Sequence, residues 1–126
     1  MAESPTRPAG RLTTHVLDTT HGRPGADMAV ALYRLGDDGA RERIASARTN
    51  ADGRCDAPLM AGETMRPGRY ELVFEVAAYF RACRVALPDP PFLDEVRLQF
   101  GIAEPGQHYH VPLLVSPFAY STYRGS

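Results

Sequence analysis

Lysine and tryptophan are both missing from this chain of 126 residues, and all 14 of its basic side chains are arginine. Schiff-base catalysis by lysine and a phosphate loop of the Walker type are therefore excluded. With 15 acidic residues the formal net charge is −1, which leaves no overall positive field to attract nucleic acid or an anionic membrane. The two cysteines, Cys55 and Cys83, are too few for a secreted domain held together by disulfides and lack the Cys-x-x-Cys spacing.

Long hydrophobic runs are also missing. No segment approaches the roughly 18 consecutive apolar residues that a membrane-spanning helix needs, and residues 1–11 lack the apolar core of a signal peptide. Hydrophobic residues nevertheless make up 44% of the chain, which is typical of a globular protein. We therefore expect a cytoplasmic protein without membrane or nucleic-acid partners, in which residues 1–10 form a flexible N-terminal tail and residues 11–126 a single domain.

Short apolar runs separated by turn-forming residues dominate the chain. Its 11 glycines and 11 prolines are scattered, and they separate runs that have the length of strands. These runs occupy residues 12–18, 28–35, 44–49, 70–76, 96–102, 108–115 and 118–123. Only residues 77–84 are predicted to form a helix, and a short one. The pattern predicts an all-β fold, an antiparallel β-sandwich.

Two of these runs place histidines on the face opposite the predicted core. His15 alternates with the apolar residues of the first run, and His108 and His110 share a face with Pro112 in the run 108–115. A proline cannot donate a sheet hydrogen bond, so Pro112 should lie at an edge, at a bulge or beside an incomplete partner strand. Because such a face is unusual in open solvent, we expect it to be buried against another subunit.

The polar residues of these segments allow more than one interpretation. A histidine can be no more than a hydrogen-bonded surface residue, but the spacing of His108 and His110 would also suit a zinc pair, with His15 or a carboxylate as third ligand. Arg48 precedes a tight turn predicted at residues 50–53. It is either half of a surface ion pair or a guanidinium that binds a planar anionic ligand, and spacing alone does not decide between them.

The C-terminal residues 120–126 are rich in aromatic and hydroxyl side chains and continue the alternation of the last run. Such a composition is unusual for a solvated chain end. No serine lies in a Gly-x-Ser-x-Gly elbow, so the nucleophile of a conventional serine hydrolase is not indicated.

Taken together, these segments resemble the transthyretin-like 5-hydroxyisourate hydrolases of urate breakdown. The resemblance covers about residues 12–126 and is carried by LTTHVLD, ARTNADGR, HYHVPLLVSP and the terminal YRGS. It implies a β-sandwich of seven to eight strands with one short helix. It also implies a homotetramer built as a dimer of dimers, with active sites at the dimer–dimer interface and neither a cofactor nor a metal ion.

The resemblance further implies which residues act on the substrate. The catalytic residues would be His15, Arg48, His110 and Ser126, and the substrate would be bound by His15, Arg48, Tyr123, Arg124 and Gly125. Water would open the six-membered ring of 5-hydroxyisourate to give 2-oxo-4-hydroxy-4-carboxy-5-ureidoimidazoline. His110, coupled to Ser126, would deprotonate the water, His15 would protonate the departing nitrogen, and Arg48 would stabilise the oxyanion.

Two other functions compete with hydrolysis at this point. The same fold could be a transthyretin-type carrier that uses its central channel for a hydrophobic ligand, or a β-sandwich that only binds other proteins. The polar residues expected in the channel favour the hydrolase.

Overall fold

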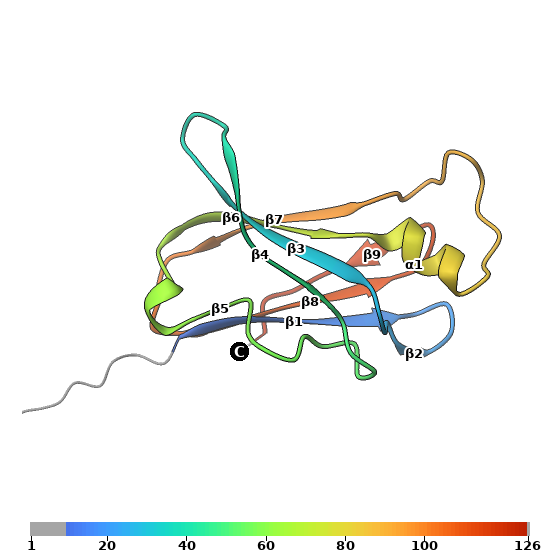
Figure 1. Ribbon diagram of the computed structural model, residues 1–126, viewed down its shortest axis with the longest axis horizontal. Helices are drawn as coiled ribbons and strands as arrows, with labels where there is room; N and C mark the ends of the chain where they lie inside the picture. Colours follow the sequence, from blue (N-terminus) through green and yellow to red (C-terminus); the bar gives the residue numbers. More distant parts are fainter. Residues whose placement is uncertain (1–9, 126) are drawn as a thin grey trace, which may run out of the picture.

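The computed structural model describes residues 10–125 of the chain. Its strands are β1 (Arg11–Asp18), β2 (Arg23–Pro24), β3 (Ala29–Leu35), β4 (Arg41–Arg48), β5 (Met60–Ala61), β6 (Gly68–Phe74), β7 (Val96–Ile102), β8 (His108–Val115) and β9 (Tyr120–Ser121), with a short 3-10 helix η1 (Gly62–Thr64) and one α-helix, α1 (Val76–Ala82). One sheet has the order β2-β1-β8-β9, with β5 also paired to β1, and the other has the order β4-β3-β6-β7. Figure 1 shows them as a lower and an upper layer, with α1 at the right-hand end.

The predicted fold class, a β-sandwich with one short helix, is confirmed. The predicted runs 96–102 and 108–115 coincide with β7 and β8, and the helix begins one residue before its predicted start. Residues 10–125 contain nine strands. Six are seven or eight residues long, and the other three (β2, β5 and β9) have only two residues each. Within the same residues, no helix is long and apolar enough to span a membrane.

One strand pair departs from the antiparallel pattern. β1 pairs with β8 in parallel, over the full length of both strands, whereas the other pairings between named strands are antiparallel. The two strands lie far apart in the sequence, and the chain passes through the whole second sheet between them, so the connection is long enough for a parallel pair. This pairing brings the histidine-bearing ends of the chain side by side.

Strand β1 carries the core on one face only. Leu12 and Val16 are fully buried between the sheets, and each such side chain contributes about 1.5–3 kcal/mol to folding. Thr14, on the same face, is 1% exposed, and its hydroxyl donates a 2.7 Å hydrogen bond to the carbonyl of Val111 on β8. The polar side chain on the inward face of β1 is thus hydrogen-bonded, and the alternate residues point outward.

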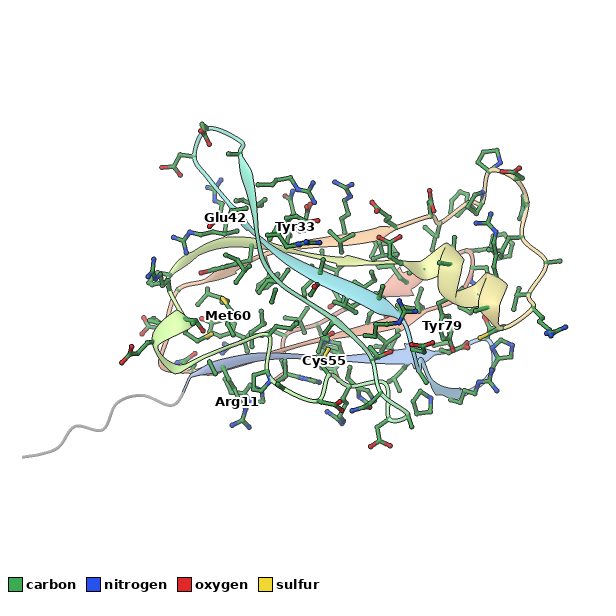
Figure 2. The ribbon with its side chains drawn as sticks, viewed as in Figure 1. Arg11, Tyr33, Glu42, Cys55, Met60 and Tyr79 are labelled. Carbon is green, nitrogen blue, oxygen red and sulfur yellow. The ribbon has the colours of Figure 1, made fainter. Side chains whose placement is uncertain are left out.

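A buried carboxylate fixes the end of β1. Asp18 accepts hydrogen bonds from the ring of His21 (2.6 Å), the backbone of residues 20 and 21, and the hydroxyl of Tyr79 on α1 (2.7 Å). Figure 2 shows Tyr79 below α1, on the side toward the first sheet. Burial raises the pKa of Asp18, but these hydrogen bonds outweigh it and hold the pKa below its usual value. His21 therefore has a structural role.

Pro112 lies where β8 lacks a complete neighbour, as predicted. β9 pairs only with Leu114 and Val115, and the next pairing on that side is the isolated bridge between His110 and Gly125. Between these points the hydroxyl of Thr122 donates to the Pro112 carbonyl at 2.7 Å. The missing amide hydrogen of Pro112 therefore interrupts no continuous strand pairing.

The two ends of the chain lie only partly within the described residues. Residues 1–9, most of the predicted tail, lie outside them, as does the predicted catalytic residue Ser126. Gly10 is buried, and its carbonyl accepts a 2.9 Å hydrogen bond from the amide of Gly62.

Candidate active site

A hollow of about 370 Å³ lies on the outer face of the first sheet, where β1 runs beside β8. We call it the histidine hollow. Its lining consists of Arg11, Thr13, Thr14, Arg54, Cys55, Ala57, His108 and His110. The parallel register sets Thr13 opposite His110 and His15 opposite Pro112, so the outward residues of both strands meet there. Arg11 and Cys55 are labelled beside the lower layer in Figure 2.

The predicted turn at residues 50–53 places Arg54 in the lining of this hollow. The side chain of Asn50 accepts hydrogen bonds from the backbone of Asp52 (2.9 Å) and Arg54 (3.1 Å). Gly53 has a φ of 76°, and its carbonyl accepts a 2.8 Å hydrogen bond from the amide of Val16. A Cβ atom at this glycine would lie 2.4 Å from the Val16 carbonyl oxygen, so only glycine permits the approach.

Arg54 follows directly and forms an isolated backbone bridge with His15. On the edge of β1 opposite β8, the backbone therefore pairs with β5, Arg54 and β2 in turn. Arg54 lines the hollow together with His108 and His110, and its positive charge acts on His110.

Arg48 lies elsewhere. It ends β4 in the second sheet, and its guanidinium donates to the side chain of Asp27 at 2.7 Å and to the Asp27 carbonyl at 2.9 Å. Both side chains of this ion pair are largely exposed. The structure does not bring Arg48 to His15 and His110, and it shows the surface ion pair that spacing had left open. Arg54, six positions further along the same ARTNADGR segment, stands where the predicted arginine was expected.

The histidines that were predicted to act together do lie together. The ring centroids of His15 and His110 are 6.4 Å apart, and those of His108 and His110 are 6.1 Å apart. His108, which sequence analysis considered only as a possible zinc ligand, belongs to the same group.

All three histidines have lowered pKa values. Burial is the main cause for each, because a desolvated imidazolium is destabilised. The positive charge of Arg54 lowers the pKa of His15 and His110 further, and Arg11 and Arg124 do the same for His108. The backbone of Asp52 opposes this at His15 with a hydrogen bond. At neutral pH these imidazoles are therefore mainly neutral and able to accept protons.

The C-terminal segment lies against His110. The amide of Gly125 donates to the His110 carbonyl at 2.7 Å, and the His110 amide donates back at 3.3 Å. A Cβ atom at Gly125 would lie 3.2 Å from two carbon atoms of His110, so a larger residue would push against the imidazole. The predicted proximity of Gly125 to the site is therefore present in the structure.

The two residues before Gly125 differ in their surroundings. The guanidinium of Arg124 donates to the side chain of Gln107 (3.0 Å) and to the His108 carbonyl (3.3 Å), and it lies 4.0 Å from the centre of the Tyr109 ring. These contacts hold the segment against β8. The side chain of Tyr123 is 61% exposed and leaves its surface available to another molecule.

The described part of the chain contains no set of side chains arranged to bind zinc. Across residues 10–125, no group of three or more histidine, cysteine, aspartate or glutamate side chains is placed to hold a metal ion.

Comparison with known proteins matches residues 12–125 to the model of the HIUase/Transthyretin family. The 5-hydroxyisourate hydrolase of Ralstonia nicotianae is 60% identical over 117 residues, which cover 93% of this chain and 99% of that protein. The solved structure of Klebsiella pneumoniae 5-hydroxyisourate hydrolase is 35% identical, with a TM-score of 0.77 and coverage of 93% of this chain and 99% of that one.

A longer solved protein contains the same fold. The crystal structure of (S)-allantoin synthase matches with a TM-score of 0.88 and 43% identity, over 94% of this chain. The match spans only 44% of the allantoin synthase chain, so this chain resembles one part of that protein.

Proposed function

Since this chain belongs to the HIUase/Transthyretin family, we propose that it hydrolyses 5-hydroxyisourate. Water attacks a carbonyl of the six-membered ring, the adjacent carbon–nitrogen bond breaks, and 2-oxo-4-hydroxy-4-carboxy-5-ureidoimidazoline is formed in urate degradation. The observation that carries the proposal is the histidine hollow, in which Arg54 and neutral histidines converge, in a chain 60% identical to a protein named for this activity.

The hollow supplies the groups that this hydrolysis needs. A neutral His110 takes a proton from the attacking water, which a lowered pKa permits at neutral pH. Arg54 stabilises the negative charge that develops on the carbonyl oxygen. His15, whose ring centroid lies 6.4 Å from that of His110, supplies a proton to the departing ring nitrogen. The proton that His110 takes from water passes to His15 and replaces the one given to the departing nitrogen, so both histidines are neutral again for the next turnover and no cofactor takes part.

The C-terminal residues complete the site in this proposal. Gly125 supports His110 through the backbone bridge, and Arg124 holds the segment in place. Tyr123 contacts the substrate through its exposed ring. Ser126, which lies outside the described residues, keeps its proposed catalytic role of orienting the attacking water with His110. Arg54 takes the role in catalysis and substrate binding that sequence analysis assigned to Arg48.

We also propose that four chains assemble as a dimer of dimers, with the active sites at the dimer–dimer interface. The exposed aromatic side chains support this, because Phe92, Phe118, Tyr120 and Tyr123 are each between 46% and 71% exposed. Phe92 and Phe118 lie together, with ring centroids 6.4 Å apart, and contiguous exposed apolar side chains are typical of interfaces. Sedimentation equilibrium measures the mass directly, and a monomeric mass under assay conditions would contradict the assembly. The cytoplasmic location stays a prediction, as does the single domain at 11–126.

The transthyretin-type carrier is the alternative function. The lining of the hollow opposes it, because two arginines and two histidines among eight residues would have to lose their hydration around a hydrophobic ligand. A spectroscopic assay separates the two functions. Urate oxidase generates 5-hydroxyisourate from urate, and its ultraviolet absorbance is followed with and without the protein. We expect the protein to accelerate the decay, and an unchanged decay rate would contradict the hydrolase.

A further inference from the structure

The side chain of Thr13 connects two histidines of the histidine hollow. Its hydroxyl oxygen lies 2.8 Å from Nδ1 of His110 and 2.7 Å from Nε2 of His108. Both distances are short for hydrogen bonds. Thr13 is the third residue of β1 and lies on its outward face, and the parallel register places it opposite His110. The role assigned to His110 does not by itself account for this bridge.

A hydroxyl group has one proton to donate, and this limits the tautomers of the two rings. If both facing nitrogens lacked a proton, one of them would have no donor. When the hydroxyl donates to Nε2 of His108, it accepts from an N–H at Nδ1 of His110. Neutral imidazole carries one N–H, so Nε2 of His110 is then left with a free electron pair. When the hydroxyl donates to His110 instead, Nε2 of His110 carries the proton.

We propose that Thr13 is a positioning residue that sets the tautomer of His110 through His108. In the working state Thr13 donates to His108 and accepts from Nδ1 of His110, so that Nε2 of His110 is the free base turned toward the hollow. This inference rests on the proposed hydrolysis, because a base that takes a proton from water must present an unprotonated nitrogen.

The surrounding charges favour this arrangement. Nδ1 of His110 is occupied by Thr13, so the nitrogen left for the hollow is Nε2. Arg54 lines the same hollow and acts on His110 by its positive charge, and a positive charge is stabilised by an electron pair rather than by an N–H group. The charge of His15 also lowers the pKa of His110, and the charges of Arg11 and Arg124 lower the pKa of His108. All of these neighbours disfavour an additional proton on the histidines.

Nitrogen-15 NMR of the imidazole groups tests the inference without relying on activity. In the unmodified protein at a pH where the rings are neutral, we expect His110 to carry its proton on Nδ1. Thr13→Val removes the hydroxyl at nearly constant volume and should leave His110 as a mixture of tautomers. Thr13→Ser keeps the hydroxyl and should restore the original spectrum. Thr19→Val is the matched control: this hydroxyl also donates to a β8 carbonyl, that of Val115 at 3.1 Å, but Thr19 does not line the histidine hollow, so the His110 signals should not change.

The most specific variant is His108→Phe, which does not change His110 itself. Without His108 as acceptor, the Thr13 hydroxyl donates to Nδ1 of His110 and moves the His110 proton to Nε2. Turnover should fall about tenfold with little change in KM, since the proton acceptor is lost rather than a substrate contact. In the Thr13→Val background, His108→Phe should have no further effect on His110, because the connecting hydroxyl is already absent.

The outcomes separate this inference from the proposed function. An Nε2–H tautomer of His110 in the unmodified protein, or an unchanged tautomer in His108→Phe, would overturn the role of Thr13 whether or not the protein hydrolyses 5-hydroxyisourate. The expected spectra in a protein that does not accelerate hydrolysis would support the tautomer coupling and reject only the substrate.

Discussion

The two arginines of the ARTNADGR segment provide a matched pair of variants. Arg54→Ala removes the side chain of a residue that lines the histidine hollow, and it leaves the backbone bridge between this position and His15 in place. Loss of one group that stabilises an oxyanion typically lowers kcat by about 10²–10³-fold. Arg48→Ala removes an ion pair whose side chains are 62% and 80% exposed. Such pairs contribute about 0–1 kcal/mol to the free energy of unfolding, so the variant should remain stable and active.

The pH dependence gives a second, independent measurement on Arg54→Ala. Arg54 is one cause of the lowered pKa of His15 and His110, after burial. Its removal should therefore raise both pKa values toward, but not fully to, their usual range. Activity requires a neutral base and so rises as pH increases through that pKa. The acid limb of the profile of kcat/KM should consequently move to higher pH in Arg54→Ala and stay in place in Arg48→Ala.

Initial rates on freshly generated 5-hydroxyisourate, with folding checked by circular dichroism, provide the assay. A folded Arg54→Ala variant with normal turnover would refute the proposed role of Arg54. A larger loss in Arg48→Ala would refute it equally, because the residue expected from sequence resemblance would then be the functional one.

Three other perturbations test separate parts of the structure. Gly125→Ala should lower turnover while the free energy of unfolding changes little, because its methyl group would press on His110 at 3.2 Å; rates and urea unfolding measured on the same sample check this. Asp18→Asn should lower the free energy of unfolding, measured with urea at neutral pH, by about 2 kcal/mol, since the hydrogen bonds are made to a charged group. Because the folded pKa of Asp18 is lowered, its stabilisation is present at neutral pH and disappears as pH falls through that pKa, so the two proteins should converge in acid. Prolonged chelation should leave the rate unchanged, and activity that chelation removes and zinc restores would reinstate a zinc site at the histidines.

Local sequence patterns predicted much of this fold. The alternation in residues 96–102 and 108–115 matched β7 and β8, and the outward placement of His15 and His110 followed from the same rule. The Asp-Gly turn was also predictable, because Gly53 adopts the left-handed conformation that the turn requires. In each case the interactions that decide the structure lie within a few residues of one another.

The features that the sequence did not predict depend on distant partners. β2 and β5 have only two residues each, too few to show an alternation. Glu71 on β6 is a charged residue but only 4% exposed, because Arg41 of β4 and Gln99 of β7 bind its carboxylate. Choosing between Arg48 and Arg54 required knowing which of the two lies beside β1, and only the structure shows that Arg54 bridges to His15. Thr13 looked like an ordinary strand residue until β8 was placed beside it.

The position of β1 between β8 and three short segments has a consequence for heat inactivation. The strand is paired on both sides, so we expect its hydrogen-bonded amides to exchange hydrogen with solvent only when the whole protein opens. Thr13 and His15 belong to this slowly exchanging strand rather than to a loop that can open alone. Catalytic competence and the folded state should therefore be lost in the same transition, and the temperature of half-inactivation should coincide with the unfolding midpoint instead of preceding it.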